Sequence, residues 1–163
     1  MVTMTDNDRR RISDMTYEEK KQKLQKQMLV YAQGDMVVAF SGGVDSSLIL
    51  KLAVQAAAKT GHKVYGIMVH TMLHPMGEVE DARVTAEQIG AEFRVLEIDE
   101  LKGADILDNP VDRCYRCKKY LFRNLIEEGK KLGVSVMMEG TNEDDLHVYR
   151  PGLRAIRELG IHS

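Results

Sequence analysis

Met36-Val-Val-Ala-Phe40 runs directly into Ser41-Gly-Gly-Val-Asp-Ser-Ser47, and this stretch determines the fold that we expect. The first five residues form an apolar run of strand length. An apolar segment of helix length, Leu48–Ala58, follows the polar turn. A strand, a Gly-rich turn and a helix in this order place free backbone N–H groups and the positive end of the helix dipole at the turn. We therefore predict a phosphate site made by Ser41, Gly42, Gly43, Asp45, Ser46 and Ser47.

The glycine turn lacks the features of the two commonest nucleotide loops. A Walker A loop needs a Lys-Ser/Thr pair after its last glycine, and a dinucleotide fingerprint needs a third glycine. Ser41-Gly-Gly-Val-Asp-Ser46 instead resembles the SGGxDS signature of the PP-loop ATP pyrophosphatase superfamily. This resemblance implies an enzyme that cleaves ATP between the α and β phosphates, adenylates a substrate and releases pyrophosphate. The alternative is a tight strand–helix connection that binds no ligand.

Length, charge and cysteine content limit the classes of protein that fit. The 163 residues suffice for one domain with a buried core, and a net charge of −2 argues against a surface that coats nucleic acid. We expect a charged tail and an amphipathic helix in residues 1–33 and an ATP-binding domain in residues 34–163. The chain shows no apolar signal core and no apolar run of membrane-spanning length. With two cysteines as a C-x-x-C pair, these features predict a cytoplasmic protein without membrane contacts.

Apolar periodicity divides the chain into alternating helices and strands. A capping box at Thr16–Glu19 predicts an N-terminal helix that Gly34 closes, with Tyr17, Leu24, Met28 and Tyr31 on its inward face. We expect strands at residues 36–40, 64–69, 93–98 and 134–138. We expect further helices at residues 47–59, 78–89 and 115–132, and a long loop at residues 99–113.

This alternation predicts an α/β fold: a doubly wound parallel sheet with helices on both faces. Ligands bind such sheets at the carboxyl ends of the strands, where the strand order reverses. For the order 3-2-1-4, that point lies between the first and fourth strands. These strands end at Ser41 and at the polar turn Gly140–Asp145, so we expect the two turns to lie side by side.

The second turn is acidic, and this suits a site for ATP. Magnesium prefers one or two carboxylates together with phosphate oxygens and water. Asp45 and Asp145, or Asp144 in its place, are the predicted ligands. Arg150, a few residues later, would neutralise charge as pyrophosphate leaves. The alternative interpretations are an acidic loop that is merely solvated and an arginine that pairs with Glu143 or Asp144.

Three later segments resemble the LarE family, ATP-dependent sulfur transferases that help to assemble the nickel-pincer cofactor of lactate racemase. The segments are Asn109–Lys119, Glu139–Asp145 and Tyr149–Leu153. The similarity runs from about Asp35 to the C-terminus and implies an adenine nucleotide α-hydrolase-like fold. It also implies adenylation of a carboxylate on a pyridinium nucleotide, followed by sulfur insertion. The chain would supply the adenylating half, and the family's C-terminal region would lie beyond Ser163.

The resemblance also assigns residues. The serines and glycines of the first turn would hold the phosphates of ATP, and His70 and Thr71 would meet adenine through their backbone. Gly140 and Thr141 would complete the nucleotide site, and Lys118 matches a basic position near the substrate phosphate. The expected catalytic residues are Asp45, Lys118 and Arg150.

Cys114 and Cys117 match the first two positions of a three-cysteine iron–sulfur cluster in part of that family. The third ligand, and the cysteine that other members sacrifice as a sulfur source, would both lie beyond Ser163. From the residues alone, a position at a helix start favours thiolates, which attack or bind metal. A metal or cluster site completed elsewhere, an inert structural pair and a redox pair all remain open.

Two other functions fit the same residues. One is another PP-loop enzyme, which thiolates tRNA or transfers ammonia to an activated acyl group. The other is a subunit that binds ATP or AMP and catalyses nothing without a partner chain that carries the C-terminal half. We expect a small-molecule substrate rather than nucleic acid, and association of the chain with itself.

Overall fold

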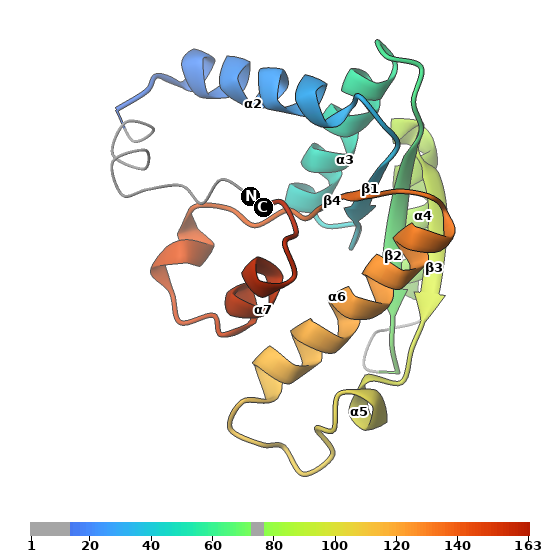
Figure 1. Cartoon of the computed structure of the whole chain (residues 1–163), viewed down its shortest axis with the longest axis vertical. Coiled ribbons are helices and arrows are strands. Elements are labelled where there is room, and N and C mark those ends of the chain that lie inside the picture. The colour runs from blue at the N-terminus through green and yellow to red at the C-terminus, as the bar shows by residue number, and fades with distance from the viewer. Residues whose placement is uncertain (1–13, 73–76) are drawn as a thin grey trace.

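Four parallel strands form one sheet in the order β3-β2-β1-β4, as the sequence predicts (Figure 1). The computed structural model describes residues 14–72 and 77–163. The strands are β1 (Met36–Ala39), β2 (Val64–His70), β3 (Glu92–Glu97) and β4 (Val136–Met138). The helices are α2 (Tyr17–Tyr31), α3 (Val44–Ala57), α4 (Gly77–Ile89), α5 (Glu100–Gly103), α6 (Arg113–Lys131) and α7 (Gly152–Glu158), with the 3₁₀ helix η1 (Asp144–His147).

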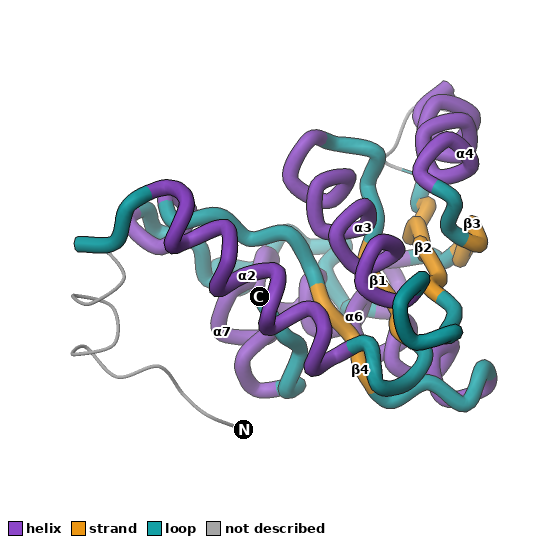
Figure 2. The backbone as a smooth tube through the Cα atoms, turned by 90° about the horizontal axis from the view of Figure 1, so that it is seen from above, coloured by secondary structure: helices purple, strands orange, loops and turns teal. Residues whose placement is uncertain are grey.

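Helices cover both faces of the sheet, which confirms the predicted doubly wound arrangement (Figure 2). Alternate residues of β1 enter two separate cores, because successive strand side chains point to opposite faces. Met36 and Val38 pack in the core with α2, α3 and α4. Val37 packs in the core with α6 and α7, beside Phe122 and Leu125.

Several elements differ from the sequence prediction: α6 begins at Arg113 rather than at residue 115, β4 begins at Val136 rather than at residue 134, and η1 and α7 were not predicted. Two further differences lie near the cavity end of the sheet. Helix α3 begins at Val44 rather than Ser47, so its first turn carries Asp45 and Ser46. Short polar side chains suit this position, where backbone N–H groups are free. The predicted loop at residues 99–113 contains the short helix α5, whose N-cap Asp99 accepts a hydrogen bond from the backbone N–H of Lys102.

The N-terminal helix packs on the α3 side of the sheet through Met28, and Leu24 and Tyr31 support this contact. The predicted capping box is present at Thr16 and Glu19. Tyr17 was expected to face inward, but it is 75% exposed because it lies in the first turn, beyond the edge of the core. The tail before residue 14 lies outside the described residues, so the division at residue 33 stays a prediction.

Helix α7 is tied to α6 by a charged cluster around Glu158. The Glu158 carboxylate accepts hydrogen bonds from the Nζ of Lys119, the hydroxyl of Tyr115 and the Nε of Arg154. These donors, Lys119 first, lower the pKa of Glu158 to about 2. The cluster fixes α7 against the first turns of α6.

Within the described residues, no helix is both long and apolar enough to cross a bilayer.

Candidate functional site

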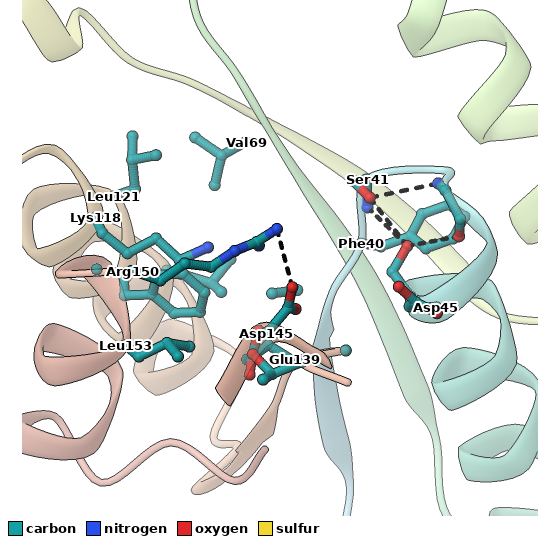
Figure 3. A pocket seen from close by; sticks show the side chains of 18 of the residues that line it. Phe40, Ser41, Asp45, Val69, Lys118, Leu121, Glu139, Asp145, Arg150 and Leu153 are labelled. Carbon is teal, nitrogen blue, oxygen red and sulfur yellow. Dashed lines mark hydrogen bonds and ion pairs between the residues drawn. The ribbon is translucent and has the colours of Figure 1, made fainter. Parts of the chain in front are cut away.

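A cavity of about 840 Å³ opens at the carboxyl ends of β1, β2 and β4 (Figure 3). One wall is the turn Ser41–Ser47, which we call the phosphate loop. The opposite wall is formed by α6 and by the segment Asn142–Arg150, which we call the acidic segment. The cavity thus lies where the strand order reverses, at the position predicted from the sequence.

Hydrogen bonds inside the phosphate loop determine its shape. The hydroxyls of Ser41 and Ser46 lie 3.1 Å apart, and the Ser41 hydroxyl accepts from the N–H of Gly43 at 3.3 Å. The Ser46 hydroxyl donates to the carbonyl of Gly43 at 3.0 Å, and that of Ser47 donates to the carbonyl of Gly42 at 3.4 Å. We expected these hydroxyls to act as ligand donors, but they bond within the loop instead. The amides at the start of α3 remain as the anion donors, since N-cap Gly43 has no side chain to cap them.

Two glycines are needed at this wall for different reasons. Gly42 has a φ of +78°, a left-handed conformation in which a residue with a side chain is strained. A Cβ added at Gly42 would also lie only 3.2 Å from the Cβ of Ala82. Gly140 lies against the start of α3, where a Cβ would be 2.9 Å from both the Asp45 carbonyl carbon and the Ser46 nitrogen. The end of β4 and the phosphate loop are therefore in backbone contact, as the predicted meeting of the two turns requires.

The two acidic residues expected to hold magnesium are connected through Asn142. Its side-chain Nδ2 donates to Asp45 Oδ2 at 3.1 Å, and its Oδ1 accepts from the backbone N–H of Asp145 at 3.0 Å. Asp45 and Asp145 line the cavity, whereas Asp144 does not. Two carboxylates beside a phosphate site fit the coordination that magnesium prefers with ATP. Asn142 was not predicted to have a role of its own, although Asn favours turns because its side chain forms hydrogen bonds with the nearby backbone.

Two cations lie on the other side of the cavity. The Arg150 guanidinium pairs with Asp145 Oδ1 at 2.9 Å, rather than with Glu143 or Asp144. The Nζ of Lys118 lies 4.8 Å from the centre of the Phe122 ring. Figure 3 shows both side chains extending across the cavity from the side opposite Ser41 and Asp45. Both cations thus line the cavity on the side opposite the phosphate loop, and their contact with phosphate stays a prediction.

Some residues expected at the nucleotide site lie elsewhere. Gly140 and Thr141 line the cavity, but His70 and Thr71 do not. The residues just before them, Met68 and Val69, form that part of the wall instead. Thr71 is buried, being 3% exposed. Contact of residues 70 and 71 with adenine stays a prediction, and residues 73–76 lie outside the described part of the chain.

The two cysteines occupy different environments. Cys114 is exposed and lines the cavity, whereas Cys117 is half-buried and does not. Burial, and then the charge of Glu100, raise the pKa of the Cys117 thiol, which opposes the thiolate that a helix start was expected to favour. Among the described residues, no third histidine, cysteine or acidic side chain joins the pair in a metal-binding group. The described residues therefore do not fit a complete iron–sulfur site.

Two further acidic residues line the cavity without having been predicted, Glu78 and Glu139. Glu139 lies at the end of β4, directly before Gly140, and is 8% exposed. A single acidic residue after an apolar strand gives no sequence signal that separates it from a solvated loop residue.

Comparison with known proteins finds one matching family model and several similar relatives. The family model "NAD synthase" matches residues 16–109. The pyridinium-3,5-bisthiocarboxylic acid mononucleotide synthase of Lactiplantibacillus plantarum is 33% identical over 141 residues, which cover 85% of this chain and 50% of that protein. The chain spans about half the length of the first curated relatives that it matches.

Two solved structures share the fold. The NH3-dependent NAD synthetase of Campylobacter jejuni superimposes with a TM-score of 0.57 at 18% identity, over 86% of this chain and 74% of that one. The U34-tRNA thiolase NcsA of Methanococcus maripaludis, solved with its [4Fe-4S] cluster, gives a TM-score of 0.57 at 18% identity, over 77% and 48%. At these identities the likeness establishes the architecture of the chain.

Proposed function

The chain belongs to the NAD synthase family of PP-loop, ATP-using enzymes, and from this premise we propose that it adenylates a carboxylate and releases pyrophosphate. The observation that carries the proposal is the link from Asp45 through Asn142 to Asp145, beside the phosphate loop. This link holds two carboxylates in the same cavity as the backbone amides at the start of α3. Carboxylates suit the magnesium ion of Mg-ATP, and helix amides suit its phosphates.

The proposed step exchanges one phosphorus–oxygen bond for another. A carboxylate oxygen of the substrate attacks the α-phosphorus of ATP, and the bond from that phosphorus to the bridging oxygen breaks. The electron pair leaves with pyrophosphate, so the step needs no protein nucleophile. The amides at the start of α3 hold the phosphates, while Lys118 and Arg150 stabilise the charge that develops on the leaving group. Bound magnesium, held by Asp45 and Asp145, would supply further charge neutralisation.

We further propose that this activation serves a sulfur transferase in cofactor biosynthesis. The support is the 33% identity to a synthase whose name specifies a bisthiocarboxylic acid mononucleotide, together with the position of Cys114 in the cavity wall. A pyridinium carboxylate mononucleotide is accordingly the proposed acceptor. An iron–sulfur cluster belongs to this proposal only if a third ligand is supplied from elsewhere.

The test is pyrophosphate release from Mg-ATP with a pyridinium carboxylate mononucleotide as acceptor. We expect Asp45→Ala to abolish magnesium-dependent release while the circular dichroism spectrum stays that of the folded protein. Asp144→Ala is the matched control, since Asp144 does not line the cavity. Undiminished release by folded Asp45→Ala would refute the proposal.

Two other functions remain as alternatives. The fold shared with a tRNA thiolase supports a PP-loop enzyme that acts on tRNA, and tRNA retained through purification would favour it. The second alternative is an ATP- or AMP-binding subunit that catalyses nothing without a partner chain. Activity that appears only when such a partner is added would favour that alternative.

A further inference from the structure

Glu139 is a buried carboxylate with an unused hydrogen-bond acceptor. Its backbone N–H donates to the carbonyl of His162 at 2.9 Å, which fixes the main chain. Its side chain lines the cavity, yet its Oε1 is sealed from solvent and has no hydrogen-bond donor among residues 14–72 and 77–163. A buried carboxylate oxygen without a donor is costly, so this position calls for a donor from a bound molecule.

The strand register locates this carboxylate within the cavity. Val38 pairs with Met138, so Glu139 lies beside Ala39, at the last residue of β1. Strand alternation places Glu139 on the same face as Met137, toward α6 and α7. Its neighbour Gly140 touches the backbone at the start of α3. Glu139 is therefore next to the phosphate loop but on the side of the cavity that faces α6 and α7.

The cations of the cavity have other contacts. Arg150 is paired with Asp145, and Lys118 lies over the ring of Phe122. Figure 3 draws Asp145 and Glu139 between these cations and the phosphate loop. A neutral N–H or O–H donor of the ligand would satisfy Glu139 without displacing either cation.

We propose that Glu139 accepts a hydrogen bond from a ribose hydroxyl of the bound nucleotide and so selects ribonucleotides over deoxyribonucleotides. The inference rests on the proposed ATP site. The donors of ATP are its two ribose hydroxyls and its adenine amino group, and the ribose is attached directly to the α-phosphate. The phosphates are proposed to bind at the start of α3, and Gly140, the neighbour of Glu139, touches the backbone there; the ribose is therefore the part of ATP with donors that we propose for Glu139. A carboxylate that binds a ribose hydroxyl recurs in nucleotide-binding α/β folds.

The experiment is a calorimetric titration of the chain with Mg-ATP, Mg-2′-dATP and Mg-3′-dATP. The three nucleotides are compared on the unchanged protein, on Glu139→Gln and on Glu139→Ala. We expect the unchanged protein to bind ATP about tenfold or more tightly than at least one deoxynucleotide, as for a lost hydrogen bond to a charged group. We expect Glu139→Ala to bring that ratio close to one, with Glu139→Gln between them. Glu143→Gln changes an exposed carboxylate of the acidic segment that does not line the cavity; it is the control and should keep the ratio.

The outcomes separate this inference from the proposed function. ATP binding with the same deoxy-to-ribo ratio in the unchanged protein and in Glu139→Ala overturns the role of Glu139 alone. An equal loss of affinity for all three nucleotides assigns the carboxylate to another group of the ligand and also overturns it. A folded chain that binds no ATP at all refutes the proposed function and this inference together.

Discussion

The two walls of the cavity are built in different ways. The phosphate loop is held by hydrogen bonds among Ser41, Gly43 and Ser46, all within six residues of sequence. The acidic segment is held by side chains: Asn142 reaches Asp45, 97 residues earlier, and Arg150 reaches Asp145. The phosphate loop is thus fixed by contacts between residues that are close in sequence. The acidic segment, where we propose that magnesium binds, depends on side-chain pairs, and we expect these to exchange partners when a ligand binds.

We expect the largest effect from a substitution that disrupts the contact between the two walls at Gly140. An added Cβ would lie 2.9 Å from backbone atoms of Asp45 and Ser46, which cannot move without shifting α3. We expect Gly140→Ala to lower the free energy of unfolding by about 1–3 kcal/mol and to weaken ATP binding more than tenfold. Chemical denaturation and calorimetry measure these effects. Gly34→Ala is the control, because its Cβ would meet nothing within 4 Å; equal effects of the two changes would contradict the contact.

Removing Arg150 tests whether the acidic segment exchanges partners. If its guanidinium moves from Asp145 to the phosphates, Arg150→Ala should weaken Mg-ATP binding by roughly tenfold, as for a lost charged hydrogen bond. Arg154→Ala removes another exposed arginine, which is paired with Glu158 outside the cavity, and it should leave affinity unchanged. Titration calorimetry measures both. Equal affinity in the two variants would mean that Arg150 only pairs on the surface.

The two cysteines allow a comparison of thiol reactivity between the cavity wall, where Cys114 lies, and the half-buried position of Cys117. Cys114 should be alkylated by iodoacetamide faster than Cys117, which is half-buried and has a raised pKa. Glu100→Gln removes one cause of that rise, so the pKa of Cys117 should fall. We expect its alkylation rate at pH 8 to increase by roughly two- to fivefold. Peptide mass spectrometry follows each thiol, and an unchanged rate would show that burial alone controls Cys117.

We expect the smallest effect from removing the Glu158 carboxylate, which joins α7, the helix after the acidic segment, to α6. Because the folded pKa of Glu158 is lowered to about 2 from an ordinary value of 4.5, its contribution to stability is complete above pH 4.5. That contribution is lost as the pH falls from 4.5 toward 2. Glu158→Gln should therefore lower the melting temperature at pH 7 slightly, and the difference should vanish near pH 2. A difference that persists at pH 2 would contradict the assignment.

Local sequence predicts one wall of the cavity better than the other. The apolar run before Ser41 and the two glycines predict a strand, a turn and a helix from adjacent residues. The alternation of elements predicts a parallel sheet, and the strand order 3-2-1-4 was expected from the family fold that the sequence resembles. The partner of Arg150 was not predictable, because η1 determines which of three successive acidic residues faces it. The partners of the serine hydroxyls were not predictable either, because Ser41 and Ser46 bond to the backbone of Gly43 in the folded loop. Side-chain pairing across the cavity requires the folded positions of both walls.

The most direct test of the account is a calorimetric titration of Mg-ATP into the purified chain, made without oxygen to protect the thiols. The phosphate loop, the pair of carboxylates and the cations all line one cavity in the described residues. The account therefore predicts one nucleotide bound per chain, with binding lost in Asp45→Ala. A folded chain that binds no Mg-ATP would contradict it and would favour a site completed by residues of a partner.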